Sequence, residues 1–77
     1  MQKEEVMEEL KEIIFLIKES EEGGYEASAL GHSIYTQAED LESLRRAVKD
    51  AIECHFEEGE RPQIIRLHMV RDEVLAL

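Results

Sequence analysis

The chain has 77 residues, 43% hydrophobic and 36% charged, which suits a single globular domain with a small core. One cysteine, Cys54, excludes an internal disulfide and fits a reducing compartment. Nineteen acidic residues outnumber nine basic ones, for a formal net charge of −10. Because nucleic acids and anionic membranes attract cationic proteins, this charge disfavours both as partners. It favours a basic protein partner, or simply a well-solvated surface.

The acidic residues are concentrated in the first three quarters of the chain. Residues 1–26 carry three basic and nine acidic groups and residues 27–60 carry three and eight, whereas residues 61–77 carry three and two. Met1–Leu10 is acidic, unlike the basic start of a secretory signal. The longest apolar run, Ile13–Ile17, is far shorter than the roughly 20 residues that span a bilayer. We therefore expect a cytoplasmic protein.

Three segments in the first half of the chain favour β-strands. Lys11–Glu19 contains an unbroken run of β-prone apolar residues, which indicates a central strand covered on both faces. Glu19–Gly24 predicts a turn, because the two glycines at its end tolerate positive φ. Tyr25–Leu30 and His32–Gln37 predict a second and a third strand, with a glycine between them.

The next segment predicts a helix over residues 41–58. Asp40 is a good N-cap, and Gly59 with Pro62 beyond it is typical of a helix end. The positions that recur at helical spacing are Leu41, Leu44, Val48, Ala51, Ile52 and His55.

The last segment, Gln63–Leu77, begins as a fourth strand with two distinct faces. Residues 72–77 either continue this strand or leave it. One face carries Ile65, Leu67 and Met69, and the other carries Ile64, Arg66, His68 and Val70. We assign residues 1–10 to an N-terminal extension, either loose or a short helix, and residues 11–77 to the domain.

These elements predict an α+β fold with the order βββαβ. A right-handed crossover through the helix places the last strand beside the first, which gives a single sheet of order 3-2-1-4. One helix covers only one face of this sheet, yet the first and last strands are apolar on both faces. We therefore expect a second copy on the open face, in a homodimer or a dimer of dimers.

Several short motifs in this frame resemble the HicB-like antitoxin family, in particular its short stand-alone members. They are GYEA at 24–27, ALG at 29–31, DLE at 40–42, AIECHF at 51–56 and GERP at 59–62. The resemblance covers residues from about Glu12 to Val70 and implies a partial ribonuclease H-like fold. It also implies a non-enzymatic protein that binds a small basic ribonuclease toxin and blocks its access to RNA.

Two-domain members of that family add a C-terminal helix-turn-helix or ribbon-helix-helix module that binds operator DNA. Only ten residues follow Leu67 here, too few for such a module, so we expect no operator binding. The resemblance thus indicates an antitoxin or an antitoxin-derived regulator in a toxin–antitoxin system. The alternative is a small structural protein that assembles only with itself.

A ribonuclease H-like nuclease would need a carboxylate at the centre of the first strand to help hold Mg²⁺. That centre is Ile14–Leu16, and Glu12 and Glu19 lie only at the strand ends. Cys54 and His55 are adjacent on the predicted helix, about 100° apart, and cannot comfortably share a tetrahedral zinc. We expect no catalytic residue, metal or cofactor, with His55 packed at the helix end and Cys54 acting as a small hydrophobe.

The candidate partner-binding residues are Tyr25, Tyr35, Ile64, Arg66, His68 and Val70. The tyrosines are candidate aromatic anchors, although either ring is equally able to pack inside the fold. Arg66 and His68 share the open face, either as a contact patch or as ordinary strand polarity with local ion pairs. The acidic segments Glu19–Glu22 and Glu57–Glu60 would steer a basic partner.

Overall fold

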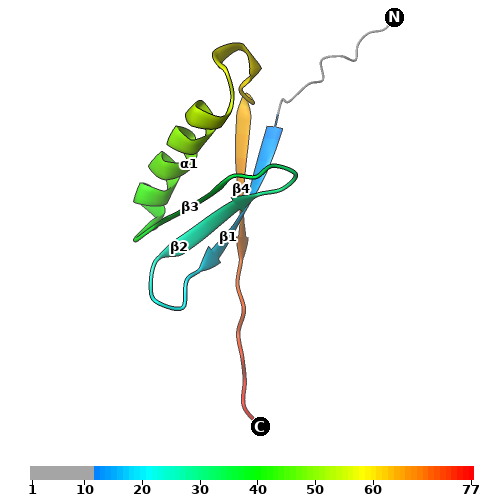
Figure 1. Ribbon diagram of the computed structural model, residues 1–77. Coiled ribbons are helices and arrows are strands. Elements are labelled where there is room, and N and C mark those ends of the chain that lie inside the picture. The colour runs from blue at the N-terminus through cyan, green and yellow to red at the C-terminus, as the bar shows by residue number, and fades with distance from the viewer. Residues whose placement is uncertain (1–11) are drawn as a thin grey trace, which may run out of the picture.

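The computed structural model describes residues 12–77, in which a four-stranded mixed sheet carries one helix on one face (Figure 1). The strand order is β3-β2-β1-β4, so the predicted α+β class, the βββαβ order and the sheet order are confirmed. The predictions for Met1–Leu10 and for Lys11 lie outside the described residues. The elements are β1 (Glu12–Glu19), β2 (Tyr25–Ala29), β3 (Tyr35–Ala38), α1 (Leu41–His55), a 3₁₀ turn (Glu58–Glu60) and β4 (Ile64–Val70).

The register of the sheet sorts its side chains into two faces. β1 pairs antiparallel with β2 and parallel with β4, and β2 pairs antiparallel with β3. Phe15 lies opposite Ala29 on one side and Leu67 on the other, and residues opposite each other point to the same face. The alternating residues Leu16 and His68 therefore point to the other face.

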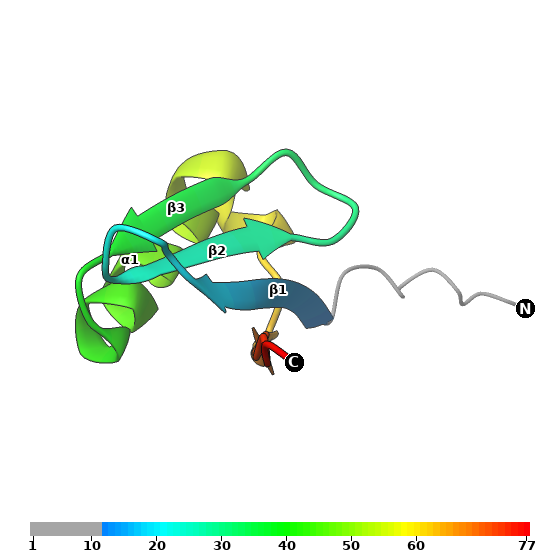
Figure 2. The ribbon, with the colours of Figure 1, turned by 90° about the horizontal axis from the view of Figure 1, so that it is seen from below.

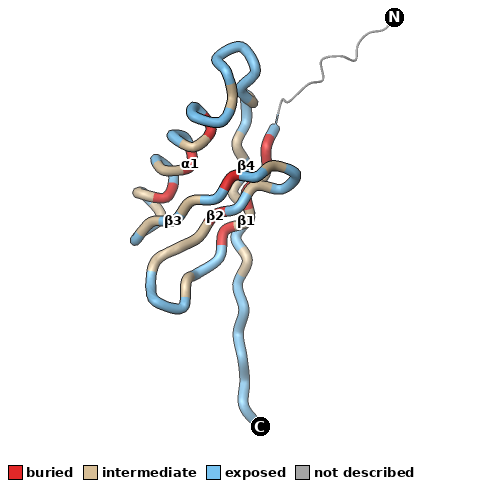
Figure 3. Tube along the Cα trace, viewed as in Figure 1, coloured by how far each residue is buried: buried red, intermediate tan, exposed pale blue. Residues whose placement is uncertain are grey.

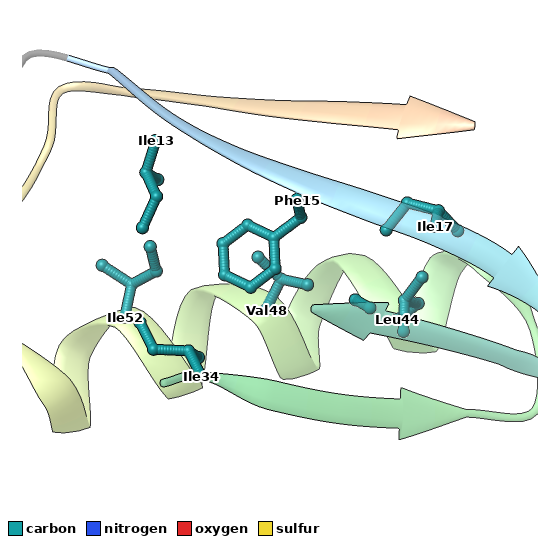
Figure 4. Close-up of a cluster of buried hydrophobic side chains, with 8 residues drawn as sticks. Ile13, Phe15, Ile17, Ile34, Leu44, Val48 and Ile52 are labelled. Carbon is teal, nitrogen blue, oxygen red and sulfur yellow. The ribbon is translucent and has the colours of Figure 1, made fainter. Parts of the chain in front are cut away.

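The core lies between α1 and the first of these faces (Figures 3 and 4). From β1 it takes alternate residues, and from α1 it takes residues four apart, which is the spacing that keeps one helical stripe against a sheet. Its buried members are Ile13, Phe15, Ile17, Ala27, Ile34, Leu44, Val48 and Ile52. The predicted helix stripe is confirmed at Leu44, Val48 and Ile52.

The helix starts as predicted but ends earlier. The Asp40 side chain accepts a hydrogen bond from the Ser43 backbone N–H at 2.7 Å, and this bond lowers the pKa of the Asp40 carboxyl. The helix ends at His55 instead of residue 58, and Gly59 lies in the 3₁₀ turn. The backbone becomes extended at Phe56, and the Arg61 guanidinium donates to the carbonyls of Glu53 and Phe56, so part of the capping at this end comes from Arg61 and not from a glycine.

The strand boundary that differs most from the prediction is the start of the third strand, and the end of the fourth, which the sequence left open, is decided by the structure. The third strand begins at Tyr35 instead of His32, because Gly31 has φ 80° and residues 30–34 form the connection from β2. β4 ends at Val70, which lies opposite Lys18 near the end of β1, so beyond it no neighbouring strand continues the pairing. Residues 71–77 belong to no element, are exposed, and run away from the sheet (Figure 1).

In the β1–β2 turn, the second of the two adjacent glycines, Gly24, cannot readily be replaced by another residue. Gly24 has φ 86°, a conformation that side chains with a Cβ rarely adopt. A Cβ there would lie 2.6 Å from the backbone oxygen of Ala38. Gly24 therefore lets β2 leave the predicted turn directly against the end of β3.

Candidate protein-binding face

The sheet face opposite α1, here called the open face, has no covering layer within residues 12–77 (Figure 2). Strand pairing places side chains from all four strands on it. They are Ile14, Leu16 and Lys18 of β1, Glu26 and Ser28 of β2, Tyr35 and Gln37 of β3, and Ile64, Arg66, His68 and Val70 of β4. Five of the six predicted partner-binding residues thus share this face: Tyr35 and the four residues of β4, which the strand alternation had placed together.

The centre of the open face is apolar and its edges are exposed. Ile14 and Leu16 are only half-buried, although they belong to the central strand. At the two edges of the sheet, Ile64 is 53% exposed and Tyr35 is 59% exposed. The open face therefore combines a half-buried apolar centre with exposed large side chains at both edges.

The two tyrosines lie on opposite faces. Tyr35 is on the open face, where its hydroxyl donates to the Gln37 side-chain carbonyl at 3.3 Å. Tyr25 lies opposite Glu19 and Ala38 on the helix-covered face and packs against the core. Of the two predicted aromatic anchors, only Tyr35 lies on the same face as the β4 residues, at the opposite edge of the sheet.

Arg66 forms an ion pair on the open face. Its Nε donates to a carboxylate oxygen of Glu12, which lies at the start of the adjacent strand. This hydrogen bond lowers the pKa of Glu12 and raises the pKa of Arg66. Of the two interpretations of Arg66, the local ion pair is the one that the geometry supports, and His68 lies beside it, exposed.

A hollow of about 750 Å³ opens at the end of the open face, between the β1–β2 turn and the residues that follow β4. Its lining contains two basic side chains, Lys18 and Arg71, and five carboxylates. The carboxylates are Glu19, Glu21, Glu22, Glu26 and Asp72. The sequence predicted the steering segment at 19–22. The contributions of Glu26 and Asp72 depend on chain segments that only the fold brings together.

His55 and Cys54 are both exposed, so His55 does not lie on the buried helix stripe where its spacing placed it, and Cys54 is not buried as a small hydrophobe. The buried helix residues lie four apart, at positions 44, 48 and 52, and the next position with this spacing is Phe56. Cys54 and His55 therefore lie to the sides of the buried stripe. The His55 ring packs edge-on against Phe56 at 4.8 Å between centroids, and His32 packs edge-on against the same ring at 5.3 Å. The three rings form an aromatic cluster at the end of α1, in which His55 is exposed and the other two rings are partly buried.

Within the described residues, no group of three or more histidine, cysteine, aspartate or glutamate side chains is placed to hold a metal ion. In the same part of the chain, no helix combines the length and the apolar character that crossing a membrane requires.

Two curated proteins match much of this chain, and both are named "UPF0150 protein". The protein from Archaeoglobus fulgidus is 60% identical over 57 residues, which cover 74% of this chain and 85% of the relative. The protein from Thermotoga maritima is 42% identical over 71 residues, which cover 92% of this chain and 100% of the relative. No family model matches the chain, and no solved structure matches it. Identity at this level over most of both relatives shows that the chain belongs to the UPF0150 family.

Proposed function

We propose that this protein is a non-enzymatic, HicB-like antitoxin or antitoxin-derived regulator that binds a small basic ribonuclease toxin through its open face. The observation that carries the proposal is the open face itself. An apolar centre and an exposed tyrosine lie on the same surface as a hollow whose lining has five carboxylates and two basic side chains. The chemical class of the toxin comes from the HicB-like resemblance of the sequence.

Each part of this surface has a role in such a complex. Ile14 and Leu16 supply apolar area that leaves water when a partner docks. Tyr35 supplies a rigid aromatic anchor at the β3 edge. The carboxylates of the hollow attract Lys and Arg side chains, the same side chains that a ribonuclease uses to bind phosphates. Occupying those side chains would block the toxin's access to RNA.

The central strand argues against catalysis on this face. The two β1 side chains in the middle of the open face are Ile14 and Leu16, at the place where a nuclease would need a metal-binding carboxylate. Glu12, at the beginning of β1, is paired with Arg66. Contact is therefore the mechanism that these residues support best.

The test is to measure binding kinetics against a basic candidate toxin encoded beside this protein, at two salt concentrations. Reversing the charge of Glu21 and Glu22 together should slow association roughly tenfold at low salt, with a smaller effect at high salt. The matched control reverses Asp50 and Glu53, which are exposed on α1 and outside both the hollow and the predicted steering segments. A larger effect from the control pair than from Glu21 and Glu22 would contradict this use of the hollow.

The Tyr35→Ala variant addresses the anchor. It should raise the dissociation rate about tenfold, because an exposed aromatic at a contact commonly contributes more than 1 kcal/mol. Absence of a complex with any basic neighbour, together with tight binding of operator DNA, would overturn the proposal.

The alternative is a small structural protein that assembles with itself and has no toxin–antitoxin role. It is favoured by the same apolar centre of the open face, which a second copy would cover. In that case Tyr35→Asp would dissociate the purified protein in light scattering, and no basic protein would bind.

A further inference from the structure

The outer edge of β4 is unprotected. β4 is an edge strand that pairs only with β1, so every second residue directs its backbone N–H and C=O away from the sheet. Within residues 12–77 nothing pairs with that edge. Natural edge strands are commonly short or carry lysine, proline or a bulge, which prevent pairing with another chain. β3, the other edge strand, has four residues, whereas β4 has seven and contains no lysine or proline.

Both sides of β4 also leave apolar side chains uncovered. The helix packs against β3 and β2, so the helix side of β4 is thinly covered, and Met69 there is 52% exposed. On the open face Ile64 is 53% exposed. A strand laid against this edge would therefore find apolar neighbours on both faces of the sheet.

The sequence of β4 is symmetrical in chemical character about Leu67. It reads Ile-Ile-Arg-Leu-His-Met-Val, with two apolar residues at each end and one basic-type residue on each side of the central leucine. An antiparallel copy centred on Leu67 would place Ile64 opposite the second copy's Val70. It would likewise place Ile65 opposite the second copy's Met69. Each of these pairs joins apolar side chains on the same face of the sheet.

We propose that two copies of this chain join along β4, antiparallel and centred on Leu67. The two sheets then form one continuous sheet with both helices on the same side, because the twofold axis is perpendicular to the sheet.

Charge favours a second copy as the occupant of this edge. Residues 61–77 carry three basic and two acidic groups, against a formal net charge of −10 for the chain. Two copies therefore repel each other least along β4, and a basic partner is drawn to the acidic surfaces elsewhere. This pairing leaves the centre of the open face free, and it does not depend on the proposed toxin binding.

The first experiment uses cysteines at exposed or half-buried positions of β4, in a Cys54→Ser background. Ile64→Cys and Val70→Cys variants with different tags are produced together in one cell, purified through both tags and oxidised. Opposite side chains in an antiparallel pair have Cβ atoms about 5 Å apart, so a mixed disulfide dimer should form. Either variant alone should not cross-link, since its two copies of the cysteine lie about 20 Å apart. A cross-link in either variant alone, or none in the mixture, would overturn the pairing.

The second experiment measures oligomeric state by sedimentation. The unmodified protein should be a dimer, and Met69→Lys should make it a monomer, because the lysine is placed against the second copy's Ile65. The matched control is Tyr35→Lys, which changes an equally exposed residue on the far edge and should leave the dimer intact. A monomeric unmodified protein, or a dimer that only Tyr35→Lys dissociates, would rule the proposal out.

Discussion

The two faces of β1 carry similar residues in very different surroundings. In β1, Ile13, Phe15 and Ile17 are at most 2% exposed beneath α1, whereas their neighbours Ile14 and Leu16 on the open face are only half-buried. All five are large apolar side chains. The difference teaches that burial depends on the covering layer, and that the face without one is where another chain is expected to dock.

The largest expected effect comes from placing a charge beneath the helix. Leu44→Asp should unfold the domain, because Leu44 is fully buried and an unpaired carboxylate there has no partner. Tyr35→Asp on the open face should leave the fold intact, since Tyr35 is 59% exposed. Far-UV circular dichroism of the two variants checks this. A folded Leu44→Asp protein would mean that the helix-covered face is not the core.

Truncating two adjacent residues of β1, one on each face, measures how much each face contributes to the free energy of unfolding. Phe15→Ala should lower the free energy of unfolding by about 3–5 kcal/mol, because it leaves a cavity in the core. Leu16→Ala should cost less than about 2 kcal/mol in the isolated protein, since the open face can lose a side chain without enclosing a void. Urea denaturation of both variants provides the values. Equal losses would indicate that the open face is covered in solution.

The smallest expected effect on stability comes from the N-terminal cap of α1, the helix that covers one face of the sheet. Asp40→Ala should lower the melting temperature at pH 7, whereas Asp40→Asn, which still caps the helix, should lower it less. The pKa of Asp40 is lowered in the folded protein, so its stabilisation is present above the unfolded pKa and is lost as the pH falls through the folded value. The difference between the original protein and Asp40→Ala should therefore shrink as the pH falls below 3.8, the ordinary value for aspartate. A difference that persists at lower pH would argue against the carboxylate as the cap.

Within the described residues, much of the fold was predictable from sequence because its signals are local. The unbroken apolar run of β1 indicated the central strand, and the spacing of Leu44, Val48 and Ile52 indicated the helix face. Alternation in β4 correctly put Ile64, Arg66, His68 and Val70 on one side. These features depend on the periods of strand and helix, which each segment carries by itself.

The rest depended on contacts between segments that are distant in the chain. Tyr25 and Tyr35 look alike in sequence, and only the pairing of three strands assigned them to opposite faces. At the end of the helix, Arg61 donates to the carbonyls of Glu53 and Phe56, an interaction that no local sequence pattern predicts. Likewise, Arg66 meets Glu12 only because the crossover places β4 beside β1. A residue type limits which contacts a side chain can make, and the packing of the sheet and helix decides which of them it makes.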